Sequence, residues 1–121
     1  MTNFAHIADR YIELWNEGDE ARRQTMLNEG WSEAATYVDP VMSGQGHAQI
    51  STLVRAVHNR FPGFRFCLDG RVDGYGDKVR FSWTFGPEAE PEMIKGTDFA
   101  VVENGRLTSV TGFLDKVPTA A

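Results

Sequence analysis

The stretch "ATYVDPV", residues 35–41, ends a β-prone run in a carboxylate that could move a proton. Pro40 follows Asp39 directly, and its ring disfavours a helical predecessor and cannot donate to a β ladder. Asp39 is therefore expected in extended backbone at a strand end, beside a flexible loop that contains Gly44 and Gly46. A carboxylate placed there could act as a general base. Asp-Pro is also a common way to start a turn, and the stretch alone leaves both interpretations open.

A second carboxylate interrupts an otherwise apolar strand pattern, "MIKGTDFAVV" at 93–102. Alternation places Asp98 on the same side as Ile94, Ala100 and Val102. A charged carboxylate on an apolar face is costly, so its pKa should rise or it should be paired. The pattern predicts a pocket role for Asp98. The alternatives are an inward ion pair or an outward solvated position, because the opposite face is mixed as well.

Tyr11 is the third candidate, on a segment with helical spacing of apolar residues over 4–15. It shares one apolar face with Phe4, Ile7 and Trp15. A phenol on that face is either part of a site or a core tyrosine whose hydroxyl finds any partner.

Aromatic residues are numerous, and three of them alternate along one predicted strand face: Phe81, Trp83 and Phe85. A pocket walled by such rings suits a flat, apolar ligand. His58 lies on the inner edge of a predicted helix and could approach the pocket, although a satisfied or exposed histidine is the commoner case. The candidate substrate-binding residues are Trp15, Trp31, Phe81, Trp83 and His58.

Composition excludes several classes of function. The net charge is −5 with no basic cluster, which argues against nucleic-acid binding. Cys67 is the single cysteine, and no histidine-carboxylate metal pattern, nucleotide-binding glycine motif or GxSxG occurs, so neither a metal nor a cofactor is expected. No apolar run approaches the roughly 20 residues of a membrane span, and the N-terminus lacks a signal core. A cytoplasmic protein without membrane association is the expectation.

The order of predicted elements indicates an α+β fold in a single domain over residues 1–121. Helices are predicted at 4–15, 19–28 and 47–60, with a very short helical turn from Ser32 and a short strand at 36–39. Four strands follow, "FRFCL", "KVRFSWTF", "MIKGTDFAVV" and "RLTSVTGFL", and short turn sequences separate them. Short connections make antiparallel hairpins. Three to four helices are therefore expected on a mostly antiparallel sheet.

With these elements in place, the chain resembles the nuclear transport factor 2 superfamily, and within it the SnoaL-like polyketide cyclases and ketosteroid isomerases. The resemblance spans about residues 5–115 and is most specific in "RYIELWNEGD", "ATYVDPV", "GHAQI" and "GTDFAVVENGRLTSVTGFLD". It implies a cone-shaped fold with a curved sheet around an apolar pocket, and a homodimer. It also implies that Asp39 shuttles a proton, that the Tyr11 hydroxyl faces the pocket, and that a protonated Asp98 donates to an oxyanion.

The leading hypothesis is a cofactor-independent isomerase or cyclase that removes a proton next to a carbonyl of a small apolar molecule. One alternative is an epoxide hydrolase or dehydratase-like lyase of the same fold, which would need an inward arginine between the carboxylates. Arg65, Arg71 and Arg80 all alternate away from the apolar face. The other alternative is a non-catalytic small-molecule binding or dimerisation module, with Asp98 outward or salt-bridged and no deep cavity at Asp39.

Overall fold

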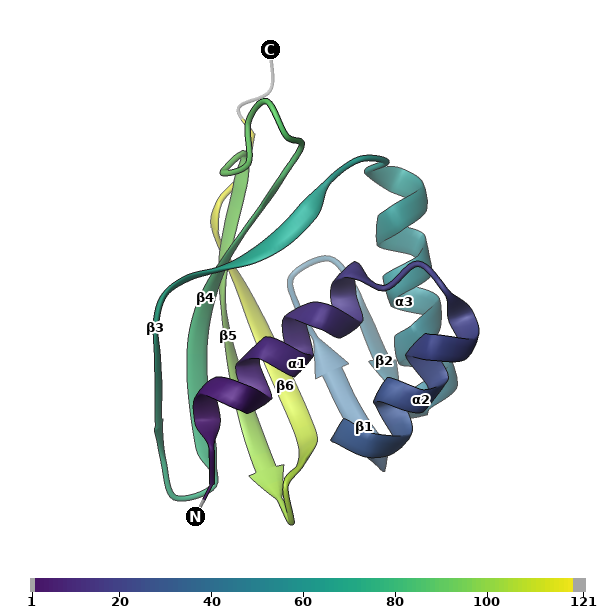
Figure 1. Ribbon diagram of the computed structural model, residues 1–121, viewed down its shortest axis with the longest axis vertical. Helices are drawn as coiled ribbons and strands as arrows, with labels where there is room; N and C mark the ends of the chain where they lie inside the picture. Colours follow the sequence, from purple (N-terminus) through teal and green to yellow (C-terminus); the bar gives the residue numbers. More distant parts are fainter. Residues whose placement is uncertain (1, 119–121) are drawn as a thin grey trace.

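Three helices lie against one face of a curved six-stranded sheet in the computed structural model, which describes residues 2–118 (Figure 1). The helices are α1 (Phe4–Asn16), α2 (Glu20–Gly30) and α3 (Gly46–Arg60). The strands are β1 (Trp31–Val38), β2 (Ser43–Gln45), β3 (Arg65–Tyr75), β4 (Lys78–Gly86), β5 (Ile94–Glu103) and β6 (Arg106–Lys116). Their order is β2-β1-β6-β5-β4-β3, and β1 pairs with β6 in parallel while the other pairs are antiparallel. The predicted α+β class is confirmed.

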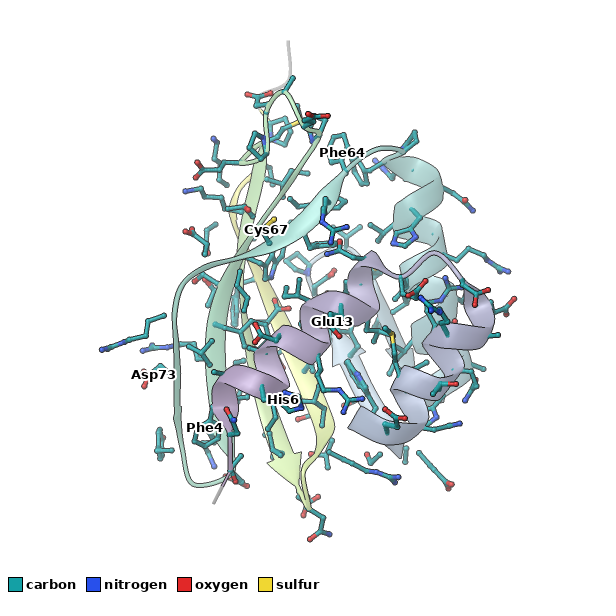
Figure 2. The ribbon with its side chains drawn as sticks, in the orientation of Figure 1. Phe4, His6, Glu13, Phe64, Cys67 and Asp73 are labelled. Atoms are coloured by element: carbon teal, nitrogen blue, oxygen red, sulfur yellow. The ribbon has the colours of Figure 1, made fainter. Side chains whose placement is uncertain are left out.

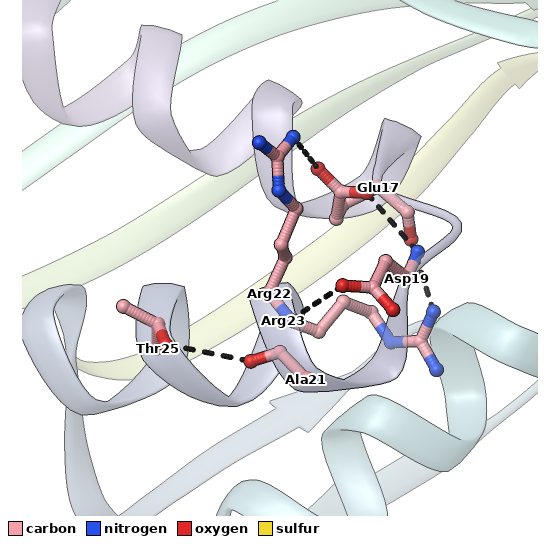
Figure 3. Close-up of polar contacts among 6 residues, drawn as sticks. All are labelled: Glu17, Asp19, Ala21, Arg22, Arg23 and Thr25. Atoms are coloured by element: carbon pink, nitrogen blue, oxygen red, sulfur yellow. Dashed lines mark hydrogen bonds and ion pairs between the residues drawn. The ribbon is translucent and has the colours of Figure 1, made fainter.

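The first two helices are joined by a turn that local hydrogen bonds hold in place. Asp19 caps α2, because its Oδ2 accepts from the backbone N–H of Arg22 at 3.2 Å. The guanidinium of Arg23 donates to the Glu17 carbonyl at 3.0 Å, as Figure 3 shows. Arg23 also donates to Ser51 Oγ at 2.9 Å, which ties this turn to α3. These hydrogen bonds hold the connection between α1 and α2 and attach it to α3.

The short helical turn predicted from Ser32 is wrong, and the strand predicted at 36–39 is longer than expected. Strand β1 begins at Trp31 and ends at Val38. Ser-Glu-Ala-Ala resembles a helix start locally, but it lies within β1, which pairs with β6 at Trp31 and again from Thr36 to Val38. Trp31 and Ala35 are buried by this arrangement. Tertiary pairing outweighs local propensity here. The loop expected around Gly44 contains the short strand β2, antiparallel to β1.

Helix α1 crosses the concave face of the sheet at close range. A Cβ on Gly74 of β3 would lie 2.6 Å from the Phe4 ring, so glycine is needed where the helix begins over the strand. Figure 2 shows Phe4 at this end of α1, with Asp73 projecting from β3 away from the helix. His6 and Glu13 are exposed on α1.

No helix within residues 2–118 is long and apolar enough to cross a membrane.

Strand register brings the candidate residues together. Asp98 of β5 lies opposite Phe81 of β4 on one side and Gly112 of β6 on the other. Strand β1 runs beside β6, with Tyr37 paired to Val110 and Val38 to Thr111. The end of β1, where Asp39 follows, therefore lies next to Gly112. Two carboxylates 59 positions apart in the sequence are thus held on neighbouring parts of one sheet.

Candidate active site

A cavity of about 570 Å³ lies between the helices and the sheet, and its wall is largely apolar. The polar residues in its lining are Asp39, Asp98, Tyr11, Tyr37 and Arg60, and Trp15 and Trp83 add indole N–H groups. The residues that line it are Tyr11, Trp15, Tyr37, Asp39, Val41, Met42, Ala56, Val57, Arg60, Phe61, Phe66, Trp83, Phe85, Ile94, Asp98, Leu114, Val117 and Pro118. A cavity of this size and character suits a small, flat, apolar ligand.

Asp39 follows β1 and lies in the wall of the cavity, with both carboxylate oxygens engaged. Its Oδ1 accepts from the backbone N–H groups of Val41 at 2.8 Å and Met42 at 2.9 Å. Its Oδ2 accepts from the Tyr37 hydroxyl at 2.6 Å. The turn that Asp-Pro predicted is therefore present, and Asp39 Oδ1 accepts the hydrogen bonds that hold it. The second oxygen, Oδ2, is the one that remains for chemistry.

Asp98 is 2% exposed and carries no ion pair among the described residues. Burial raises the pKa of Asp98 from 3.8 to about 6, and the hydrogen bond that the Tyr11 hydroxyl donates to Asp98 Oδ2 works in the opposite direction. Asp98 Oδ1 is buried and has no hydrogen-bond partner within residues 2–118. A protonated Asp98 would therefore have a free donor at Oδ1.

Tyr11 is held rigidly beside Asp98 by surrounding rings. Trp31 stacks on it with ring centroids 5.9 Å apart, and Phe81 meets it edge-on at 5.0 Å. Burial, followed by the nearby Asp98, raises the pKa of Tyr11 well above 10, so its hydroxyl stays protonated. Tyr11 thus remains a hydrogen-bond donor over the ordinary pH range.

Gly112 lets the polar groups approach one another. A Cβ at Gly112 would lie 2.8 Å from Asp98 Oδ1 and 3.2 Å from Asp39 Cβ. The sum of these lengths, about 6 Å, is an upper limit on the distance between Asp98 Oδ1 and Asp39 Cβ. The base and acid candidates can therefore contact one small substrate, as acid–base chemistry requires.

The structure brings some of the predicted site residues to the cavity and leaves others behind its wall. Tyr11, Asp39, Asp98, Trp15 and Trp83 line it. Trp31 and Phe81 pack against the Tyr11 ring and are absent from the lining. His58 is also absent from the lining, and its Nε2 lies 2.6 Å from the Trp15 carbonyl oxygen. Substrate contact by these three stays a prediction, and their observed neighbours are protein groups.

Sequence reasoning did not single out Tyr37, Gly112 or Arg60. Tyr37 lies two residues before Asp39, and a strand period of two puts both on one face, which was an available signal. Gly112 offers no comparable sign in the sequence. Arg60 ends α3 at the cavity wall, with its guanidinium carbon 5.6 Å from the Phe61 ring centroid.

The described side chains offer no metal site and no carboxylate–arginine–carboxylate bridge. Within residues 2–118, no three His, Cys, Asp or Glu side chains gather closely enough to hold a metal ion. Arg65, Arg71 and Arg80 do not line the cavity. The exposed Arg60 makes no ion pair with Asp39 or Asp98 among the described residues.

Three helices on a curved sheet around an apolar cavity define the class of nuclear transport factor 2-like proteins. The chain belongs to the SnoaL-like domain family within that class, because the family matches residues 8–110. No curated protein matches the chain significantly.

Solved structures agree with this assignment. A candidate isomerase of the SnoaL-like family from Agrobacterium tumefaciens strain C58 is 40% identical, with a TM-score of 0.89 over 95% of this chain and 99% of the other. A candidate ketosteroid isomerase from Kribbella flavida is 18% identical, with a TM-score of 0.69 over 96% and 80% of the two chains. A candidate polyketide cyclase from Sinorhizobium meliloti is 15% identical, with a TM-score of 0.70 over 88% and 93%. The last two support the fold alone.

Proposed function

We propose that this protein is a cofactor-independent isomerase or cyclase that removes a proton next to a carbonyl group of a small apolar substrate. The observation that carries the proposal is one apolar cavity with two unlike carboxyl groups in its wall. Asp39 Oδ2 has a single donor, and the nearby Asp98 is buried with a pKa raised to about 6. Two carboxyl groups with different environments fit the separate roles of base and acid.

In the proposed reaction, Asp39 takes a proton from the carbon next to the carbonyl group. The electrons of the C–H bond form the enolate, whose negative charge rests on the substrate oxygen. The protonated Asp98 stabilises that oxygen by donating from Oδ1, because Oδ2 already accepts from the Tyr11 hydroxyl. Tyr11 has a single hydroxyl hydrogen, so in this arrangement it supports the oxyanion through Asp98. Return of the proton to another carbon gives an isomer, and attack of the enolate on a second carbonyl group of the same substrate gives a ring.

The choice of an apolar substrate follows from the wall of the cavity. Trp15, Phe66, Trp83 and Phe85 form a continuous aromatic surface, in which Phe66 and Phe85 stack with centroids 3.9 Å apart. Such a surface gains most from flat hydrocarbon rings. The candidate isomerase from Agrobacterium tumefaciens, at 40% identity, supports isomerisation as the first reaction to assay.

Replacement of Asp39 by asparagine tests the proposal. Turnover of a Δ5-3-ketosteroid and of small β-diketones should fall by about 10²- to 10⁴-fold, the usual contribution of a general base. Asp9→Asn is the matched control, because Asp9 is exposed on α1 and the same charge is removed. Turnover that is unchanged in Asp39→Asn would exclude Asp39 as the base.

The alternative, a non-catalytic small-molecule binding or dimerisation module, predicts a different environment for the same two carboxyl groups. It calls for an outward or salt-bridged Asp98 and for no deep cavity at Asp39. Asp98 is instead buried without an ion pair among residues 2–118, and Asp39 lines the cavity. These observations favour the enzyme. A homodimer is part of the same proposal, and light scattering in solution tests it directly.

A further inference from the structure

Tyr37 lies between the two carboxyl groups and has no role in the reaction as described above. Tyr37 is 5% exposed, and its ring packs against Trp15 with centroids 5.1 Å apart; the residue lines the cavity. Its hydroxyl donates to Asp39 Oδ2 at 2.6 Å. Burial is the main cause that raises the pKa of Tyr37 far above 10, so the hydroxyl keeps its hydrogen throughout.

The hydrogen bonds of Asp39 determine which oxygen receives the substrate proton. Oδ1 already accepts from the backbone N–H groups of Val41 and Met42, so a proton there would meet two donors. Oδ2 has one donor, the Tyr37 hydroxyl, and a lone pair to spare. A proton taken from the substrate therefore settles on Oδ2, the same atom to which Tyr37 donates.

Protonation of Oδ2 weakens that hydrogen bond. A hydroxyl donates about twice as strongly to a charged oxygen as to a neutral one. When Asp39 takes the proton, the negative charge moves from Oδ2 to the substrate oxygen. The Tyr37 hydrogen then has a neutral acceptor on one side and an oxyanion in the cavity.

The distances allow the hydroxyl to follow the charge. A Cβ at Gly112 would lie 3.5 Å from Tyr37 Oη and 2.8 Å from Asp98 Oδ1, so these oxygens are at most about 6.3 Å apart, the sum of the two lengths. One substrate oxygen that accepts two hydrogen bonds of about 2.8 Å spans up to about 5.6 Å between donors. The upper limit is only about 0.7 Å beyond that span, and rotation about the Tyr37 C–O bond turns the hydroxyl hydrogen from Asp39 towards the cavity. The Tyr37 and Tyr11 hydroxyls are also close enough for each to affect the pKa of the other.

We propose that Tyr37 is a switching hydrogen-bond donor, which holds Asp39 Oδ2 before proton transfer and stabilises the substrate oxyanion after it. The inference rests on the proposed function and deepens it. The step is balanced: Asp39 gains the proton, the C–H electron pair becomes the enolate, and the Tyr37 hydroxyl changes acceptor without losing its hydrogen. Return of the proton to carbon restores the resting hydrogen bond.

Asparagine at position 39 mimics the protonated base. Its Oδ1 can keep the two backbone hydrogen bonds, which turns its Nδ2 donor towards Tyr37 Oη. Tyr37 then has no acceptor at position 39, and its hydrogen is free for a ligand. This makes a double-mutant cycle between Asp39→Asn and Tyr37→Phe a direct test.

The probe is 4-nitrophenol, a flat aromatic molecule whose oxyanion resembles an enolate and whose absorbance reports its ionisation. In the Asp39→Asn protein, we expect Tyr37→Phe to weaken binding of the ionised probe by about tenfold, as loss of a hydrogen bond to a charged group does. With Asp39 present, the same change should cost less than about twofold, because Tyr37 is already engaged. Tyr75→Phe is the matched control, since Tyr75 is 73% exposed and lies outside the cavity lining.

A merely structural role for Tyr37 would weaken binding equally in both backgrounds, and that result overturns the inference. Equal affinity in all four proteins overturns it as well. Near-UV circular dichroism shows whether each variant is folded. If Tyr37→Phe is not, proton NMR of the Tyr37 hydroxyl in the folded Asp39→Asn protein replaces it, and a signal that does not move when the ionised probe binds overturns the inference. The proposed function is judged separately, by turnover of Asp39→Asn, so loss of turnover with no coupling in the cycle rejects the Tyr37 inference alone.

Discussion

Replacing Asp98 by asparagine should stabilise the protein at neutral pH and change its stability little in acid. Asp98 is 2% exposed, and burial raises its pKa in the folded protein from 3.8 to about 6. In the unfolded chain the group ionises near its ordinary value. As pH rises from 3.8 to 6, the unfolded chain releases its proton first, so the folded state loses stability across this window.

The size of the effect follows from the gap between the two pKa values. At 1.36 kcal/mol for each pKa unit, a rise from 3.8 to about 6 corresponds to about 3 kcal/mol of lost stability above pH 6. Asparagine has no charge to bury, and its carbonyl oxygen can still accept from the Tyr11 hydroxyl. The variant should therefore recover most of that free energy at neutral pH.

Urea unfolding, followed by tryptophan fluorescence over a series of pH values on both sides of this window, measures the difference. The free energy of unfolding of Asp98→Asn minus that of the wild type should grow by about 3 kcal/mol across the window. Asp9→Asn removes the same charge from an exposed site and should show no such growth. Parallel curves for Asp98→Asn and the wild type, or a variant less stable at neutral pH, would refute the reasoning that burial dominates at Asp98.

Three further outcomes are expected. Gly112→Ala should lower turnover more than tenfold and destabilise the protein by about 1–3 kcal/mol, because its methyl group would lie 2.8 Å from Asp98 Oδ1. Gly18→Ala is the control, because the space around Gly18 is open and neither effect is expected. Turnover assays and urea unfolding compare the two variants. The kcat/KM of the isomerisation should fall as pH rises through about 6, since the protonated donor at Asp98 is lost, and Asp98→Asn should remove this dependence in a pH–rate profile. Asp19→Ala should cost about 1 kcal/mol in urea unfolding through loss of the α2 cap, with turnover unchanged.

Local sequence signals were enough to predict much of the fold. Local patterns predicted three helices to within about two residues of the observed bounds, and alternation with turn sequences predicted the four consecutive antiparallel strands. The same alternation placed Asp98 on the inner face, where it is buried. These signals work because helix and strand periods decide locally which side chains face the core.

The first part of β1 was mispredicted because its structure depends on a distant segment. Ser32 has the chemistry of a helix cap, but β1 pairs with β6, whose residues lie more than 70 positions later. No local window contains that partner. Gly112 was missed for the same reason, since its importance comes from the side chains of Asp98 and Asp39 that approach it across the sheet.

Alternation also cannot separate the residues that line a cavity from those that pack behind it. Phe81 and Trp83 lie on one strand face and both are buried, yet Trp83 lines the cavity while Phe81 packs on Tyr11. The difference depends on what covers each ring, and α1 covers Phe81 through Tyr11. The sequence could have predicted the position of Tyr37, because Tyr37 lies two positions before Asp39 and a strand period of two places both on one face.

In the proposed mechanism, the turn and the base, which the sequence offered as alternatives for Asp39, are parts of one arrangement. The turn uses Oδ1, through the backbone N–H groups of Val41 and Met42, and thereby fixes the carboxylate so that Oδ2 remains for Tyr37 and the substrate. A carboxylate free to rotate would present either oxygen to the substrate. The proton that it takes would then not always lie on the oxygen that accepts from Tyr37. The turn after Pro40 is thus what makes the chemistry of the two oxygens unequal. Substitutions that loosen this turn should lower turnover even where they leave Asp39 itself in place.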